Sequence, residues 1–287
     1  MARGGIARVA ILGLGAVGRA LARQIADRGG ISVIGIADSS AALTCAPGTA
    51  LNAAQLRDLV AGKEAGRALA ECAMPEGLSV RRGGAGDLVL SLPDAADDHR
   101  LSGPIVVADC SNSGTSVSCL RLAVARGFRV AAANKKPFSD SSMQVFRELT
   151  ASPASCRFES TAGAATPFVT TAMRLRAAND DVSAVLGSMS GTLGYLMSEL
   201  ETAVTPSLGA ALASAIEQGY TEPDCRDDLS GVDVQRKAVI LARVLGHDIS
   251  MDDVPVEALY PDSLATVCVA MCAVQRDWCA RRTLEAV

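Results

Sequence analysis

Acidic side chains stand close to a lysine in the segment "GYTEPDCRDDLSGVDVQRKAVILARVLG", residues 219–246. Asp233 and Lys237 are four residues apart, so a helix places them on one face. One interpretation is a capped helix with a surface ion pair, which is worth little free energy. The other is a site for a small zwitterion, in which carboxylates bind an ammonium group and the lysine faces a carbonyl or hydroxyl oxygen. The residues alone leave both open.

The last third of this segment predicts an amphipathic helix that begins near Ser230. Ser230 is a candidate N-cap with Asp233 at the third helical position, an arrangement like a capping box. Asp227 and Asp228 precede the helix, where carboxylates are favourable. Lys237 then lies at the edge of the apolar stripe.

A glycine-rich turn, "GLGAVG", follows the first apolar run and opens a helical segment. Gly13 permits a tight turn, Gly15 lets the backbone approach a pyrophosphate, and Gly18 allows close helix packing. Asp38 ends the next predicted strand, where an acidic residue accepts hydrogen bonds from an adenosine ribose. The pattern predicts a dinucleotide site rather than a turn without a ligand. Asp38 favours NAD over NADP, although Ser39, Ser40 or Arg19 could reshape the pocket.

Polar residues follow two further predicted strands. Ser111 and Asn112 come after "IVVADC", and Asn134, Lys135 and Lys136 come after "RVAAA". Ligands of open α/β sheets bind at the carboxyl ends of strands, so we expect both groups near the nicotinamide. The alternative for "NKKP" is a solvated loop.

Strands and helices alternate through both halves of the chain, which indicates an α/β fold with a Rossmann-type, doubly wound parallel sheet. We expect a dinucleotide-binding domain over residues 1–150 and a second, α+β substrate domain over residues 151–287. The predicted strands cover residues 7–15, 31–39, 104–113, 129–137 and 182–192, and a further strand begins at residue 156 and runs into a Gly/Ala-rich turn. The predicted helices cover 16–30, 52–65, 114–128, 141–154, 167–178, 193–202 and 207–220. Residues 86–100 are predicted as a strand or turn followed by an acidic loop.

Composition excludes several classes of protein. Hydrophobic residues make up 49% of the 287 residues. The net charge is −4, so there is no basic surface that would indicate nucleic-acid binding. No polybasic patch or apolar segment of membrane-spanning length is present. Nine cysteines without pairing rhythm, and no secretory pattern, predict reduced thiols and a cytoplasmic location.

These motifs together resemble homoserine dehydrogenase, most closely the form fused to aspartate kinase. The similarity runs from about residue 6 to about residue 262 through "GLGAVG", "ANKKP", "FESTAGAATP", "SGTLGYLMSEL" and the acidic-lysine segment. It implies NAD(P)-dependent interconversion of L-homoserine and L-aspartate 4-semialdehyde by a homodimer. The roles carried over are catalysis by Lys237, Lys135 and Asp233; substrate binding by Thr192, Tyr220, Glu222 and Asp228; coenzyme binding by Gly13, Gly15, Ala16, Val17, Gly18, Asp38, Ser111, Asn112 and Lys135; and sodium binding by Glu159, Ala162, Ala164 and Thr166.

The resemblance also implies a departure at the C-terminus. The family continues with further strands and a glycine segment, whereas "ATVCVAMCAVQRDWCARRTLEAV" does not match them, which predicts a fold truncated there. Two other hypotheses therefore stay open. One is a catalytically impaired relative that binds nucleotide, and the other is a dehydrogenase of a different amino-acid-derived substrate on the same scaffold.

Overall fold

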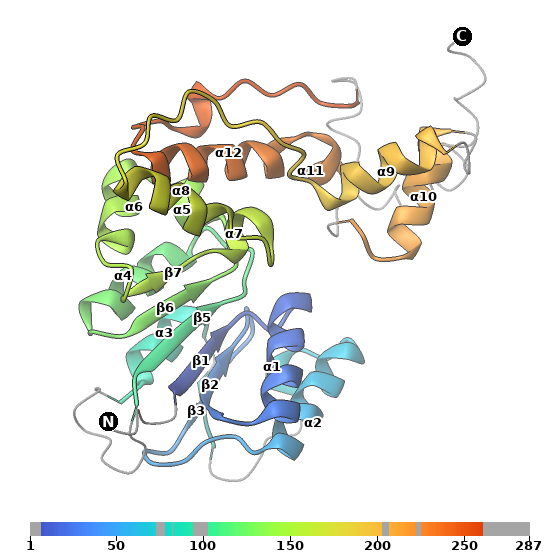
Figure 1. The fold of residues 1–287 in the computed structure, drawn as a ribbon. Coiled ribbons are helices and arrows are strands. Elements are labelled where there is room, and N and C mark those ends of the chain that lie inside the picture. The colour runs from blue at the N-terminus through green and yellow to red at the C-terminus, as the bar shows by residue number, and fades with distance from the viewer. Residues whose placement is uncertain are drawn as a thin grey trace. The chain divides into compact units, whose positions relative to one another are not determined.

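The computed structural model describes residues 7–72, 78–81, 83–93, 103–202, 207–221 and 225–260. The chain divides into two compact units, Met1–Arg174 and Leu175–Val287, which are drawn in Figure 1. Each is described by itself. The functional boundary expected near residue 150 stays a prediction.

The first unit is built on one seven-stranded sheet with the order β4-β3-β2-β1-β5-β6-β7. The five strands from β2 to β7 in this order are parallel, and β3 and β4 add an antiparallel edge beyond β2. The strands are β1 (Ala7–Leu12), β2 (Ile31–Ala37), β3 (Ala42–Cys45), β4 (Leu78–Arg81), β5 (Ile105–Asp109), β6 (Arg129–Ala132) and β7 (Cys156–Arg157).

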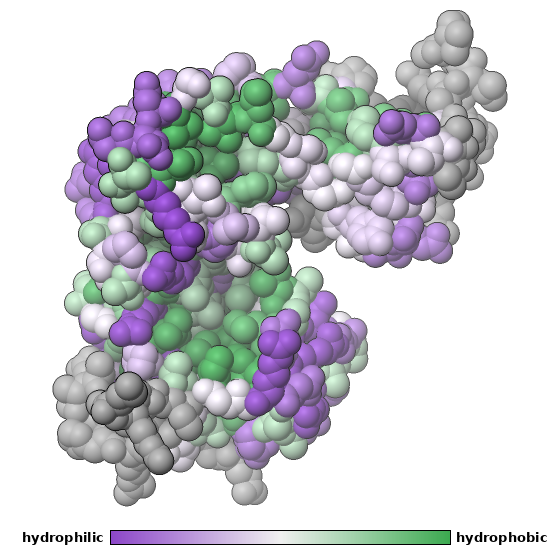
Figure 2. Space-filling view, viewed as in Figure 1, coloured by the Kyte–Doolittle hydropathy of each residue, from purple (hydrophilic) through white to green (hydrophobic). Residues whose placement is uncertain are grey.

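Helices cover both faces of this sheet (Figure 1). Helices α1 and α2 pack against each other, whereas α3 packs across β1, β2 and β3 and against α4. The outer surface over α1 and α2 carries hydrophilic side chains (Figure 2), as expected for amphipathic helices that face solvent. The helical elements are α1 (Ala16–Arg28), α2 (Ala53–Glu64), η1 (Leu69–Glu71), α3 (Ala85–Ser91), α4 (Ser116–Ala125), α5 (Lys136–Ser139), α6 (Met143–Thr150) and α7 (Ser160–Gly163), with α8 (Phe168–Ala177) crossing into the second unit.

The central strand β1 is buried on both faces, which explains its uninterrupted apolar sequence. Val9 and Ile11 belong to the core cluster that includes residues of α1 and α2. Ala10 and Leu12, which alternate with them along the strand, are also fully buried. A strand of this kind ends only where the chain can leave the core, and here it ends at the glycine turn.

The second unit is helical over its described residues. It contains α9 (Gly191–Glu201), α10 (Leu208–Glu217), α11 (Cys225–Leu229), α12 (Val232–Leu245) and η2 (Met251–Asp253). Helices α9, α10 and α11 share a small core that includes Leu196, Ala211 and Leu229. This core holds α11 and the start of α9 together, and both elements carry predicted substrate residues.

The structure confirms the α/β fold and most predicted elements, but it corrects two of them and adds two strands. Residues Ala85–Ser91 form helix α3 rather than a strand, because the Asp87 carboxylate accepts the Gly84 amide at the helix start and Leu88 is buried. No strand forms over residues 182–190, where Leu186 is 93% exposed. The edge strands β3 and β4 were not predicted.

The start of α12 also differs from the prediction. Its N-cap is Gly231, in a left-handed conformation with φ of 76°, rather than Ser230. The Ser230 hydroxyl still accepts a hydrogen bond from the Val232 amide, at 3.3 Å. Asp227 and Asp228 lie in the short helix α11 rather than in a turn.

The remaining fold-level predictions concern location and thiols. No helix in the described part of the chain is long and apolar enough to cross a membrane. The cysteines found in the described residues are free thiols. Burial raises the pKa of Cys45 to about 11 and that of Cys156 to about 12, so these thiols are protonated packing groups at neutral pH.

Candidate functional site

The glycine turn lies at the switch point of the sheet. From β1 the chain proceeds to β2 on one side and later reaches β5 on the other, so the loops after β1 and β5 diverge there. A methyl group on Gly13, whose φ is 87°, would lie 2.8 Å from the Cα and N atoms of Ser111. A methyl group on Gly18 would lie 1.9 Å from the Gly13 carbonyl oxygen. The two predicted coenzyme loops therefore contact each other, and only glycine fits.

Helix α1 offers an uncapped N-terminus beside this contact. Its N-cap Gly15 makes no side-chain hydrogen bond, and its first turn holds no acidic residue. Gly15, Ala16 and Val17 are exposed, and a methyl group on Gly15 would meet no atom of the chain within 4 Å. The free amides of such a helix end suit an anion, so these residues fit the pyrophosphate of a dinucleotide.

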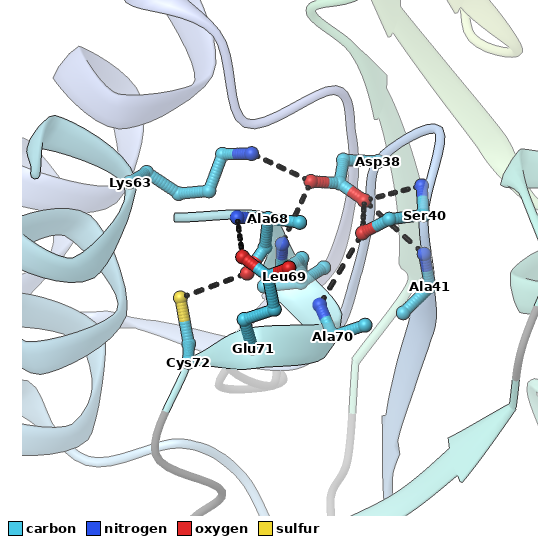
Figure 3. Close-up of polar contacts among 9 residues, drawn as sticks. All are labelled: Asp38, Ser40, Ala41, Lys63, Ala68, Leu69, Ala70, Glu71 and Cys72. Atoms are coloured by element: carbon cyan, nitrogen blue, oxygen red, sulfur yellow. Dashed lines mark hydrogen bonds and ion pairs between the residues drawn. The ribbon is translucent and has the colours of Figure 1, made fainter. Parts of the chain in front are cut away.

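Asp38, the predicted ribose acceptor, lies at the end of β2 with both oxygens bonded inside the chain (Figure 3). Oδ2 accepts from Lys63 Nζ at 2.7 Å and the Leu69 amide at 3.1 Å, and Oδ1 accepts from the amide and hydroxyl of Ser40. Burial opposes ionisation, but Lys63 and the hydrogen bonds from Ser40 outweigh it and lower the pKa of Asp38 to about 2. Asp38 therefore has a structural task besides any contact with ribose.

The polar loops after β5 and β6 meet at the same edge of the sheet. The Ser111 amide and hydroxyl both donate to Asp109 Oδ1, at 3.0 and 2.7 Å. Lys136 Nζ donates to the Asn112 carbonyl oxygen at 3.0 Å. Lys135 is the N-cap of α5, and its carbonyl oxygen accepts the amide of Phe138. The predicted group of Ser111, Asn112 and Lys135 is thus assembled within the first unit.

In the second unit, Lys237 is held by two oxygen atoms. Its Nζ lies 2.7 Å from Asp233 Oδ2, one turn earlier on α12, and 2.5 Å from the carbonyl oxygen of Met189. The Lys237 side chain is 14% exposed. The predicted pairing of Asp233 with Lys237 is therefore present, and the amine is largely withdrawn from water rather than extended into it.

Thr192 ties the other predicted substrate residues to the same segment. Its hydroxyl lies 2.7 Å from the Tyr220 carbonyl oxygen and 2.8 Å from Asp228 Oδ1, and both Thr192 and Asp228 are buried. Because Met189 and Thr192 are three residues apart, the start of α9 links the Lys237 pair to α11. Glu222 lies outside the described residues.

Three comparisons with known proteins bear on this site. The sequence profile of homoserine dehydrogenase matches residues 167–279. A homoserine dehydrogenase of Paracoccidioides brasiliensis is 35% identical over 192 residues, which cover 63% of this chain and 52% of that protein. The chain belongs to the homoserine dehydrogenase family. The profile match continues past residue 262, where the motif-based resemblance was expected to end.

The family includes fused and single-function proteins. The bifunctional aspartokinase/homoserine dehydrogenase 2 of Zea mays is 34% identical over 197 residues, which cover 66% of this chain and 21% of that protein. The chain thus spans about half the length of the fungal homoserine dehydrogenase and a fifth of the bifunctional protein. A hyperthermophilic archaeal homoserine dehydrogenase in complex with NADPH shares the fold, with a TM-score of 0.61 at 22% identity over 86% of this chain and 74% of that one.

The turn expected to bind sodium in homoserine dehydrogenases serves a local structural role here. The Glu159 carboxylate accepts the amides of Val169 and Thr170, at 2.8 and 2.9 Å, and so caps the start of α8. Ala164 has a φ of 51°, which bends the backbone of the turn sharply. Sodium binding was expected at Glu159 and at the backbone carbonyls of this turn. The contacts above do not test it, so sodium binding stays a prediction.

Sequence reasoning missed Lys63, Asp109 and Tyr195. The Tyr195 ring lies 4.9 Å from that of Tyr220, centroid to centroid, and orients the exposed side chain of Tyr220. Lys63 lies on α2, remote in sequence from Asp38, and no local pattern marks it. Asp109 is the last residue of an otherwise apolar strand, and a charged residue at that position could have indicated a functional role.

Proposed function

We propose that this chain interconverts L-homoserine and L-aspartate 4-semialdehyde with NAD or NADP as coenzyme. The observation that carries the proposal is the Lys237 amine, held against Asp233 and the Met189 carbonyl with little exposure to water. Membership of the homoserine dehydrogenase family and the uncapped, glycine-lined start of α1 support it.

The first unit supplies the coenzyme site. The amides at the start of α1 bind the pyrophosphate, and Gly15 leaves room for it. Ser111, Asn112 and Lys135 line the nicotinamide end, because they follow the strands on the far side of the switch point. When bound, the nicotinamide accepts a hydride from the alcohol carbon or returns it to the aldehyde carbon.

The second unit supplies charges that match an amino acid. Carboxylates of the acidic segment, Glu222 and Asp228 among them, suit the substrate ammonium, and the resemblance adds Tyr220 as a further substrate contact. In the direction of reduction, the carbonyl oxygen gains negative charge as its carbon receives the hydride. Lys237 or Lys135 donates the proton that completes the hydroxyl group, and the other lysine stabilises the charge or binds the substrate carboxylate.

The experiment is an initial-rate assay of the purified chain with L-homoserine and NAD⁺ or NADP⁺, followed by the absorbance of the reduced coenzyme. We expect turnover by the wild type. Lys237→Met should lower kcat by about 10²- to 10⁴-fold, the contribution typical of a general acid or base. Lys237→Arg keeps the charge, but a guanidinium does not give up its proton near neutral pH, so this variant should also be inactive if Lys237 transfers the proton.

Coenzyme binding provides the control for this assay. NADPH fluorescence titration should give the same dissociation constant for wild type and Lys237→Met, because the residues of α1 lie in the first unit. A folded wild type that binds coenzyme but never oxidises L-homoserine would refute the proposal and favour an impaired relative. Turnover of another hydroxy amino acid in preference to L-homoserine would favour a different dehydrogenase.

The resemblance extends the proposal to assembly and ion binding. We propose a homodimer, which light scattering of the purified chain tests directly. A sodium ion on Glu159 and on the backbone carbonyls of Ala162, Ala164 and Thr166 would raise the melting temperature in sodium relative to potassium salts at equal ionic strength.

A further inference from the structure

Asp109 is a charged side chain with no exposure to solvent, at the carboxyl end of β5. In the part of the chain that the structure describes, it has no ion-pair partner. Both of its oxygens instead accept hydrogen bonds from neutral groups, which are the amide and hydroxyl of Ser111 and the side-chain nitrogen of Asn134, at 3.1 Å. A buried carboxylate is costly unless it is fully hydrogen-bonded, so this position needs a reason.

Asn134 extends the same network to Ser113 of the loop and to Ser116, the first residue of α4. Its Nδ2 atom, which carries two hydrogens, lies within 3.2 Å of Asp109 Oδ2, Ser111 Oγ, the Ser113 carbonyl oxygen and Ser116 Oγ. Its Oδ1 accepts the amide of Lys136. Asn134 is 3% exposed. One amide group therefore joins the loop after β5 to the start of α5.

The geometry assigns Asp109 a positioning role in the proposed reaction. We propose that Asp109, acting through Ser111 and Asn134, fixes the nicotinamide end of the coenzyme site and the backbone that carries Lys135. Ser111 is the residue against which Gly13 packs, and Lys135 directly follows Asn134. A shift in the hydrogen-bond network would therefore move Ser111, which contacts the glycine turn, together with Lys135. The inference rests on the proposed function, which supplies both the coenzyme site and the turnover that the test measures.

An acceptor is required at both Asp109 oxygens, because every group that faces them is a donor. In Asp109→Asn, the new amide nitrogen must face either Ser111 or the Nδ2 of Asn134, and a buried donor is left without an acceptor. Asn134 cannot compensate by flipping, since its nitrogen would then face the Lys136 amide.

The test compares wild type, Asp109→Asn and the control Asp27→Asn. Asp27 is 64% exposed and pairs with Arg57 on the surface, so the control makes the same chemical change away from the network. Three quantities are measured for each protein: kcat with L-homoserine, the dissociation constant of NADH or NADPH, and the dissociation constant of ADP. ADP occupies the adenosine and pyrophosphate part of the site and leaves the nicotinamide end empty.

Asp109→Asn should lower kcat and weaken NAD(P)H binding, each by about 10- to 100-fold, the cost typical of one unpaired buried donor. ADP binding should change by less than about twofold, since α1 is untouched. If Asp109→Asn weakened the binding of ADP and of NAD(P)H equally, general unfolding would be indicated and the proposal would be overturned. It would also be overturned if kcat and NAD(P)H binding of Asp109→Asn equalled those of wild type.

The outcome separates this inference from the proposed function. If the wild type binds NAD(P)H but does not oxidise L-homoserine, the proposed function fails, while the contrast between NAD(P)H and ADP still decides the role of Asp109. A wild type that binds neither NADH nor NADPH overturns both.

Discussion

Replacing Asp38 by asparagine removes the charge that joins the end of β2 to the segment Ala68–Cys72 (Figure 3). Lys63 and the amide of Leu69 would lose an anionic acceptor, and Ser40 would keep only a neutral one. The ordinary pKa of 3.8 falls to about 2 in the folded chain, because these contacts outweigh the opposing effect of burial. Since one pKa unit corresponds to about 1.4 kcal/mol, the ionised form stabilises the fold by about 2 kcal/mol.

The sign of the pH dependence follows from the lowered pKa. The stabilisation is complete well above the ordinary pKa, declines as the pH falls below about 4, and is lost as the pH passes about 2. Asp38→Asn resembles the protonated wild type at every pH. The difference in unfolding free energy between the two proteins should therefore be about 2 kcal/mol at pH 7 and about half of that at pH 3.

Urea unfolding at pH 7 and at pH 3 measures this difference. Amide hydrogen exchange adds a local readout, because the amides of Ser40, Ala41 and Leu69 donate to Asp38 and should exchange faster in the variant. The control Asp27→Asn removes one member of an exposed ion pair and should change the unfolding free energy by less than about 1 kcal/mol. A variant as stable as wild type at pH 7, or a loss that does not shrink toward pH 3, would refute the reasoning.

Three further predictions test the two units. Gly15→Ala should leave the melting temperature unchanged, because its methyl group meets no atom of the chain, yet it should weaken NAD(P)H binding about tenfold or more. Gly18→Ala should lower both the melting temperature and the affinity for NAD(P)H, because its methyl group meets the backbone. Thr192→Val should lower the unfolding free energy by about 1–3 kcal/mol in urea titrations, and Thr192→Ser should lose less, because it keeps the hydroxyl that bonds to Asp228. Lys63→Met should weaken the binding of NADPH more than that of NADH in fluorescence titrations, because it leaves the charge of Asp38 without its cation.

Local sequence patterns predicted the parallel half of the sheet well, because each element there carries its own periodicity and stop. The run "ARVAILGLG" is apolar throughout and ends in glycine, and the following helix ends at Gly29. Residues 85–91 were harder, since "DLVLS" contains a short apolar run that suits a strand as well as a helix. Its helix depends on a cap at Gly84 and on burial of Leu88 against Gly35 of β2.

The candidate site was predicted where its residues lie close in sequence and missed where they are brought together by the fold. Asp233 and Lys237 are one helical turn apart, and their contact is present. Lys63 reaches Asp38 from another helix, so no short motif could reveal that the predicted ribose acceptor already has a cation. Spacing also says nothing about solvent, and the complete burial of Asp109 emerges only when β1 and β6 flank β5.

The transfer of a hydride from L-homoserine is the central claim, and deuterium reports it directly. The purified chain is incubated with L-homoserine that is deuterated at the hydroxyl-bearing carbon and with NAD⁺ or NADP⁺, and the reduced coenzyme is examined by mass spectrometry. We predict that the coenzyme gains one deuterium with wild type and none at a comparable rate with Lys237→Met. Folded wild-type protein that binds coenzyme and transfers no deuterium from this substrate would contradict the account.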